Sequence, residues 1–257
     1  MMRILLKPLH FLYVIYAFAL FALLMIPVFV WALIVSLFGR IRGGNLLYYA
    51  CTLWADVWFP LIFIWHRNIY VEKPVRHKSY IFVANHISYL DSAILPKTFR
   101  HPVRPLGKVE MAKIPIFGTI YRNVIVTVDR SSAANRARSV QIMKLILQKE
   151  ISVLVFPEGT FNTTGKPLKD FYDGAFRIAI ETGTPVKPVL FLHTYDRMHY
   201  DSVFSLNPGK SRSVFLPAVP VEGLTLDDVG MLRDRVYKIM EEELVKRGAK
   251  WIVEKGS

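Results

Sequence analysis

The 257-residue sequence predicts an α/β fold: a layered αβα domain with a largely parallel sheet, preceded by N-terminal membrane-associated helices. Two observations lead to this fold class. Beyond about residue 68, short apolar runs alternate with amphipathic stretches, which is the pattern of strands alternating with helices. Before that point the chain is largely apolar, as expected of helices in or on a bilayer. We therefore assign residues 1–66 to membrane-anchoring helices and residues 67–257 to a second domain.

The first apolar segment, Phe11–Phe38, contains 28 residues without a formal charge. At about 1.5 Å per residue a straight helix of this length would span roughly 42 Å, more than the roughly 30 Å hydrocarbon core. One tilted spanning helix and a helical hairpin broken near Pro27 both fit this length. Basic residues flank the segment on both sides, at Arg3, Lys7, Arg40 and Arg42. This symmetry favours both ends on the cytoplasmic side.

A second apolar segment, Leu46–Trp65, carries three tryptophans and is interrupted by Asp56. Because tryptophan prefers the headgroup level of a bilayer, we interpret the segment as an interfacial helix rather than a second span. The alternative is a core helix of the following domain.

The remaining elements follow from apolar runs and helical periodicity. Strands are predicted at Ile69–Glu72, Tyr80–Ala84, Val124–Val128, Val153–Phe156, Val186–Leu192 and Val214–Leu216. Helices are predicted at Ser88–Pro96, Met111–Tyr121, Ala133–Lys149, Gly174–Glu181 and Leu226–Arg247.

Charge indicates the kind of partner. The net charge is +13, and residues 97–150 hold eleven Lys and Arg against three Asp and Glu. A basic surface beside a membrane anchor suggests phospholipid headgroups or substrates that bear phosphate. We discount nucleic acid because no recognised binding motif is present and the anchor directs the chain to a bilayer. The single cysteine, Cys51, excludes an intramolecular disulfide.

The residues most informative about function are Asn85–Asp91, directly after a predicted strand. His86 falls at a strand-to-helix turn, and Asp91 falls in the first turn of the helix that Ser88 is predicted to start. This spacing lets a carboxylate hold one imidazole nitrogen while the other faces a substrate. The alternative is a capping box between Ser88 and Asp91 beside an ordinary loop histidine.

Phe156–Thr160 forms a second polar turn after a predicted strand. Glycine permits close backbone approach, and Glu158 and Thr160 remain as polar groups at the strand end. Strand carboxyl ends line the ligand crevice in α/β sheets, so the turns at His86 and Glu158 would converge if their strands are neighbours.

Taken in order, these motifs resemble those of the glycerolipid acyltransferases, and more closely the bacterial 1-acyl-glycerol-3-phosphate acyltransferase group. The resemblance covers roughly residues 80–192. Its four blocks, in order, are first Asn85-His86 with Asp91, second Gly107–Glu110 with Ile114–Gly118 and Val128–Arg130, third Phe156–Thr160, and fourth Thr184–Val189.

The resemblance implies transfer of an acyl group from coenzyme A or acyl carrier protein to the sn-2 hydroxyl of a membrane lysophospholipid, giving phosphatidic acid. A hydroxyl needs a base to take its proton, which suits His86, with Asp91 fixing its tautomer. We expect direct transfer without an acyl-enzyme and without a cofactor beyond the acyl donor. The expected location is the cytoplasmic face of the bacterial inner membrane.

Family members similar to this chain bind the acceptor's phosphate through basic residues of the second block, which here are Lys108 and Arg130. In the third block, Glu158 is expected to bind an acceptor hydroxyl or to hold the loop that does. Gly159 and Thr160 match the same block and complete the expected binding residues.

Two positions depart from the family pattern. Phe161 stands where the family usually has arginine, and Asp173 stands where a lysine is common. Lys166 or Lys169 could replace the missing positive charge. Otherwise the acceptor is another lipid hydroxyl, such as that of an N-acyl amino acid on the way to a glycine or ornithine lipid.

Two other interpretations are a metal-binding site and a non-catalytic lipid-binding protein. His193, Asp196 and His199 match no standard metal-binding spacing, so we predict no metal site. The basic segment and the apolar N-terminus would also suit a non-catalytic protein that binds anionic lipid, but such a protein has no need of His86 and Asp91 at this spacing.

Overall fold

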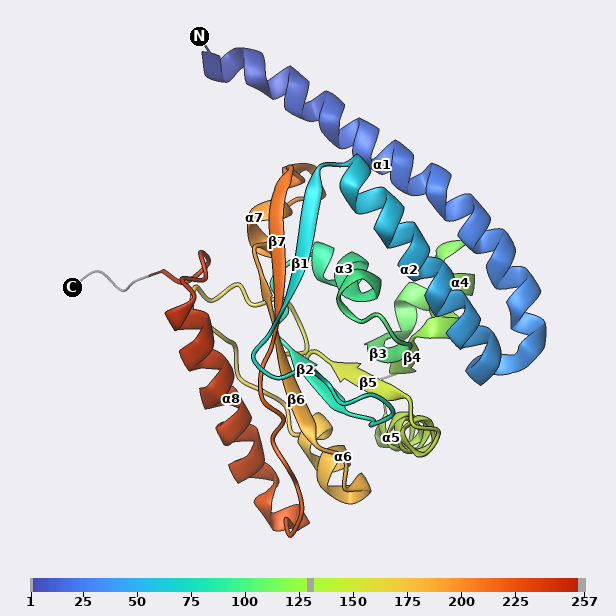
Figure 1. The fold of residues 1–257 in the computed structure, drawn as a ribbon, viewed down its shortest axis with the longest axis vertical. Helices are drawn as coiled ribbons and strands as arrows, with labels where there is room; N and C mark the ends of the chain where they lie inside the picture. The colour runs from blue at the N-terminus through green and yellow to red at the C-terminus, as the bar shows by residue number, and fades with distance from the viewer. Residues whose placement is uncertain (1, 129–131, 254–257) are drawn as a thin grey trace.

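The computed structural model describes residues 2–128 and 132–253, and it contains a seven-stranded sheet flanked by helices on both faces (Figure 1). The strand order is β1-β7-β6-β2-β5-β3-β4. All neighbouring pairs are parallel except β6 and β7. The predicted α/β class with a largely parallel sheet is confirmed.

The strands are β1 (Ile64–Tyr70), β2 (Ile81–Ala84), β3 (Val103–Lys108), β4 (Val126–Val128), β5 (Ser152–Val155), β6 (Val186–Leu192) and β7 (Gly209–Phe215). The α-helices are α1 (Met2–Val35), α2 (Gly44–Leu61), α3 (Leu90–Thr98), α4 (Phe117–Val124), α5 (Ala133–Gln148), α6 (Gly174–Thr182), α7 (Thr194–Arg197) and α8 (Val229–Lys246).

Two hydrophobic cores cover the two faces of the sheet. Along β2, Phe82 and Ala84 point into the core shared with α1, α2 and α3. Ile81 and Val83 point into the core that α5, α6 and α8 close. Successive strand residues point to opposite faces, so a strand that is buried on both faces reads as one continuous apolar run. This is why the sequence identified β2 and β6 nearly to their ends.

Strand β3 was not predicted, because Pro105 and Gly107 fall within it and both residues are disfavoured inside strands. Pro105 nevertheless pairs with Leu154 of β5. Strands β1 and β7 also begin five residues before their predicted starts, at Ile64 and Gly209. Both carry polar residues that conceal the apolar pattern.

The N-terminal helices form an antiparallel hairpin (Figure 1). Helix α1 continues through Pro27, so the alternative of a hairpin broken near this proline is wrong. The chain reverses instead at residues 36–43, where Gly39 adopts a φ of 74° that favours glycine. By length and composition, one stretch of the described residues, Lys7–Leu61, could cross a membrane, which supports membrane association.

Helix α2 combines the two interpretations offered for the second apolar segment. Trp54 and Trp58 are buried against α1 rather than placed at a headgroup surface, and the indole nitrogen of Trp58 donates to the carbonyl of Ala17 at 3.0 Å. The opposite side of the helix exposes an apolar stripe at Leu46, Tyr49, Leu53, Val57 and Leu61. Trp65 lies on β1, because the helix ends at Leu61.

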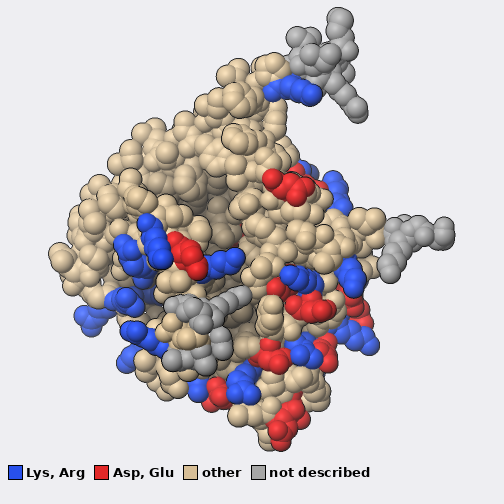
Figure 2. Space-filling view, turned by 180° about the vertical axis from the view of Figure 1, so that it is seen from behind, with Lys and Arg blue, Asp and Glu red and all other residues tan. Residues whose placement is uncertain are grey.

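Polar bonds fix the hairpin to the sheet domain. Asp56 of α2 accepts hydrogen bonds from Lys97 at 2.7 Å and from both terminal nitrogens of Arg100 at 2.8 and 2.7 Å. The charge that interrupts the second apolar segment therefore faces the domain. Figure 2 shows that the hairpin side of the molecule is mostly uncharged, with basic side chains gathered next to it.

Replacement of Trp58 tests this packing. Trp58 is 1% exposed and stacks on Trp54 with ring centroids 5.1 Å apart. We expect Trp58→Ala to lower the free energy of unfolding by about 3–5 kcal/mol, measured by thermal denaturation in detergent. Leu53→Ala, at a side chain that is 67% exposed, is the control and should change it by less than about 0.5 kcal/mol.

Candidate active site

The two polar turns identified in the sequence meet at one edge of the sheet. Strands β2 and β5 are parallel neighbours, with Val83 opposite Val155. Their carboxyl ends therefore lie side by side, and the chain that leaves each strand enters the same region. His86 follows β2 and Glu158 follows β5, so the expected convergence is present.

His86 and Asp91 are directly bonded. The Nδ1 atom of His86 lies 3.0 Å from Oδ2 of Asp91, whose side chain is completely buried. The same oxygen accepts the backbone N–H groups of Ile87 at 2.7 Å and Ser88 at 2.8 Å. Helix α3 begins at Leu90 rather than Ser88. Asp91 therefore combines both predicted roles, since it binds the backbone before the helix and also the imidazole.

This bond orients the imidazole. An ionised carboxylate can only accept a hydrogen bond. When His86 is neutral, Nδ1 therefore carries the hydrogen and Nε2 carries the lone pair. The His86 side chain is 18% exposed. Within the described residues, the hydrogen bonds of the ring involve Nδ1 only. The imidazole is thus arranged to accept a proton at Nε2 from a group that enters the site.

Glu158 connects three segments of the site. Its buried carboxylate accepts the backbone N–H of His86 at 2.8 Å with one oxygen and that of Lys169 at 2.9 Å with the other. Burial raises the pKa of Glu158 to about 7, against the lowering effect of these two bonds. Since both oxygens are engaged with backbone, this geometry favours the second expected role, that of holding the loop.

Aromatic side chains enclose the histidine. The ring of Phe156 stacks on His86 with centroids 4.2 Å apart, and Phe161 meets His86 edge-on at 4.4 Å. Phe161 also contacts Tyr89, with ring centroids 4.9 Å apart. The sequence motifs include Phe156, but its position at the end of an apolar strand gave no sign that it packs on His86.

Asn85 is a further contributor that sequence reasoning left without a role. Its side-chain oxygen accepts the N–H of Phe191 at 2.8 Å, and its amide nitrogen donates to the carbonyl of Phe191 at 3.2 Å. This pair of bonds ties the end of β2 to β6 where the regular ladder stops. Asn85 thereby fixes the backbone from which His86 projects.

The expected binding residues occupy different places. Lys108 is the exposed last residue of β3, at the same edge of the sheet as Glu158. Arg130 lies outside the described residues. Gly159 has a φ of 73°, which favours glycine. Thr160 is exposed, and its hydroxyl oxygen accepts a hydrogen bond from Nζ of Lys169 at 3.0 Å.

The two departures from the family pattern are different in kind. Asp173 forms an ion pair with Arg233 of α8 at 2.8 Å, so its carboxylate faces that helix. Phe161, by contrast, contacts the imidazole. Lys169 brings a positive charge next to Thr160, and of the two lysines considered as substitutes it is the one bonded to the motif.

The C-terminal segment supports the loop after Glu158. Trp251 donates its indole N–H to the carbonyl of Pro167 at 3.1 Å, and the N–H of Val253 donates to the carbonyl of Gly165 at 2.9 Å. Residues more than eighty positions apart make these contacts, and the local sequence contained no signal for them.

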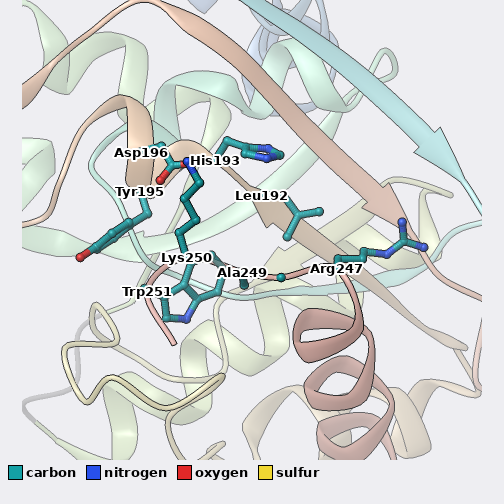
Figure 3. Close-up of a pocket in the computed structure, with 9 residues that line it drawn as sticks. Leu192, His193, Tyr195, Asp196, Arg247, Ala249, Lys250 and Trp251 are labelled. Atoms are coloured by element: carbon teal, nitrogen blue, oxygen red, sulfur yellow. The ribbon is translucent and has the colours of Figure 1, made fainter. Parts of the chain in front are cut away.

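The three residues considered for a metal have separate partners. His193 Nε2 lies 3.2 Å from Arg212, His199 lies 2.7 Å from the Tyr195 hydroxyl, and Asp196 lies 3.5 Å from Lys250. Figure 3 shows Lys250 reaching toward Asp196 across a small pocket between residues 192–196 and the end of α8. Among the described residues, no group of three or more His, Cys, Asp or Glu could hold a metal ion.

Known proteins are similar to this chain in sequence and in fold. The family model described as Acyltransferase matches residues 66–192. An uncharacterized acyltransferase, C1851.02, from Schizosaccharomyces pombe is 29% identical over 66% of this chain, which spans 62% of that relative's length. A putative 1-acyl-sn-glycerol-3-phosphate acyltransferase, acl-2, from Caenorhabditis elegans is 30% identical over 72% of this chain and 69% of its own length.

A further relative is the 1-acyl-sn-glycerol-3-phosphate acyltransferase of Salmonella typhimurium, which is 29% identical over 68% of this chain and 72% of its own length. The crystal structure of the 1-acyl-sn-glycerophosphate acyltransferase PlsC from Thermotoga maritima has the same fold. It superimposes with a TM-score of 0.78 at 22% identity and covers 95% of this chain and 98% of its own.

The matched sequences define an enzyme of the acyltransferase class. This chain belongs to the glycerolipid acyltransferase family, as its motifs predicted.

The raised pKa of Glu158 makes the stability of the loop depend on pH. An acid whose pKa is about 7 in the folded protein and 4.5 in an exposed glutamate binds more protons when folded, so its contribution to stability falls as pH rises between these values. We expect the free energy of unfolding of wild type, relative to that of Glu158→Gln, to fall by about 2–3 kcal/mol between pH 5 and pH 8. Unfolding of both proteins across this range measures the difference, and parallel curves would contradict it.

Proposed function

We propose that this enzyme transfers an acyl group from an acyl thioester, on coenzyme A or acyl carrier protein, to the sn-2 hydroxyl of 1-acyl-glycerol-3-phosphate. The product is phosphatidic acid. The observation that carries the proposal is the bond between His86 Nδ1 and the buried Asp91, held at the sheet edge beside Glu158. The names of the relatives from Salmonella typhimurium and Caenorhabditis elegans support this acceptor.

In this mechanism His86 is the general base. Its Nε2 takes the proton of the acceptor hydroxyl as the oxygen attacks the thioester carbonyl, and Asp91 stabilises the imidazolium that forms. Collapse of the tetrahedral intermediate breaks the carbon–sulfur bond, and the imidazolium proton passes to the departing thiolate. Transfer is direct, and the residues need no cofactor beyond the acyl donor.

Cations at the same edge of the sheet suit an acceptor phosphate. Lys108 ends β3, and Lys169 is bonded to Thr160 in the loop that Glu158 holds. We propose that the acceptor site consists of Lys108, Lys169, Thr160, Gly159 and Arg130. A phosphate monoester needs several such donors because its charge is concentrated on a few oxygens.

The N-terminal hairpin supports a membrane location. Its exposed apolar residues are suited to lipid, which is also where acceptor and product reside. We propose the cytoplasmic face of the bacterial inner membrane as the place of action, with the phospholipid surface as a partner and no role for nucleic acid.

Substitution of His86 tests the catalytic proposal. We expect His86→Ala and Asp91→Asn to lower the rate of thiol release by about 10²–10⁴-fold, because each removes part of the general base. The assay supplies lysophosphatidic acid and acyl-CoA or acyl carrier protein in mixed micelles. Unchanged vesicle binding with lost activity supports catalysis, whereas no activity of wild type with any acceptor would support a non-catalytic lipid-binding protein.

A second acceptor is favoured by Phe161. Its ring contacts the imidazole where the family usually has an arginine, so an apolar group lies next to the reacting hydroxyl. The second candidate function therefore uses the same chemistry on another lyso-lipid acceptor, such as an N-acyl amino acid whose charge is a carboxylate.

Two substitutions distinguish the acceptors. If the acceptor is a phosphate monoester, we expect Lys169→Ala to raise its KM by roughly 10-fold, since a charge-assisted hydrogen bond is worth about 1.5–3 kcal/mol. If the acceptor is an N-acyl amino acid, Phe161→Arg should improve use of lysophosphatidic acid and impair the native acceptor. A strict preference of wild type for lysophosphatidic acid would reject the second function.

A further inference from the structure

The segment between β3 and α4 exposes apolar side chains although it is not part of the hairpin. Residues Val109–Lys113 form a short 3₁₀ turn, and Ile114–Ile116 lead into α4. Met111, Ile114 and Ile116 are exposed, Ile116 to 58%. An isolated exposed apolar residue needs no explanation, but three within six positions form a patch.

The backbone at the tip of this segment is strained. Ile116 has a φ of 65° and a ψ of −63°, and the N–H of Phe117 donates to the carbonyl of Pro115 at 2.7 Å. This is the positive-φ form of the γ-turn, which is rare and costly, above all for a β-branched residue. Strained residues of this kind cluster at functional sites. Here it leaves the Ile116 side chain exposed.

The segment adjoins the hairpin. Helix α4 packs on both α1 and α2. The guanidinium of Arg104 in β3 donates to the side chain of Asn45 at 2.6 Å and to the carbonyl of Ile41 at 3.4 Å, which joins the sheet to the hairpin connection. The connection itself exposes Leu37 and Phe38. The apolar segment therefore leads directly into a helix that packs on the hairpin.

Charge around this surface suits anionic lipid. Arg40 and Arg42 of the connection, Lys113 of the segment and Arg122 of α4 are all exposed, with Glu110 as the acidic neighbour. In the described part of the chain, no ion pair joins Arg40, Arg42 or Lys113 to a carboxylate. Apolar side chains flanked by free cations are typical of helices and loops that lie at a membrane interface.

We propose that residues 111–116 are a second membrane-contacting element, which inserts Ile114 and Ile116 into an anionic bilayer beside the hairpin. This inference rests on the proposed function in one respect, that the substrates are membrane lipids. Lys108 lies one residue before the 3₁₀ turn, so insertion would hold it at the level of the phosphates. The occupant of this surface is thus a lipid headgroup region and not a protein.

A fluorescent label measures insertion directly, independent of the hairpin's affinity for lipid. In a Cys51→Ala background, Ile116→Cys carries an environment-sensitive label, and Met231→Cys on α8, where Met231 is 55% exposed, is the matched control. Both full-length proteins are reconstituted in phosphatidylcholine vesicles with and without phosphatidylglycerol. Quenching is measured with spin-labelled lipid and with aqueous iodide.

We expect spin-labelled lipid to quench the label at 116 several-fold more than the label at 231, with a larger difference when phosphatidylglycerol is present. Equal iodide quenching at both sites would overturn the proposal. Protection at 116 that requires added acyl carrier protein would also overturn it, since the surface would then bind a protein. Neither result depends on transferase activity. A failure of the membrane-insertion proposal can therefore be distinguished from a failure of the proposed acyltransferase function.

A second variant separates insertion from folding. Glycine relieves the strained φ, so we expect Ile116→Gly to keep the thermal midpoint of wild type while it lowers turnover of vesicle-borne acceptor relative to acceptor in detergent micelles. Equal loss of turnover in vesicles and micelles would contradict insertion, because a role in the site itself would then explain the defect.

Discussion

The buried carboxylate of Glu158 is the interaction on which the rest of the site depends. Because β2 and β5 pair in parallel, their carboxyl ends lie at the same edge of the sheet, but the segments that follow them run separately. Glu158 joins them, since it accepts one N–H from the His86 turn and one from Lys169. Each of its two oxygens accepts a different backbone donor, which an apolar side chain of the same size could not do.

The site and the membrane surface are connected through the same few elements. Helix α2 contributes Asp56 to bonds with α3, whose first turn holds Asp91. Strand β3 ends at Lys108 and is bonded to the hairpin through Arg104. Two elements that carry candidate active-site residues, α3 and β3, are therefore bonded directly to the hairpin, so Asp91 and Lys108 are positioned with respect to the hairpin as well as to the sheet.

Much of this fold and site could be predicted because the relevant patterns are local. Buried strands such as β6 are continuous apolar runs, and His86 and Asp91 are five residues apart. The missing parts depend on contacts that no local pattern records. Strand β3 contains Pro105, the hairpin turns beyond Pro27, and Asp173 is neutralised by Arg233, sixty positions away. The clamp of Glu158 on backbone donors likewise required knowledge of which strands are neighbours.

The contact between Val253 and Gly165 has a consequence for the order in which the molecule is assembled. The hairpin precedes the sheet domain in the chain, whereas β1 cannot pair with β7, with Ile64 opposite Gly209, until much of that domain has been synthesised. The loop after Glu158 is fixed later still, because Trp251 and Val253, which donate hydrogen bonds to it, are among the last described residues. The hairpin can therefore be complete long before the loop after Glu158 is fixed in place.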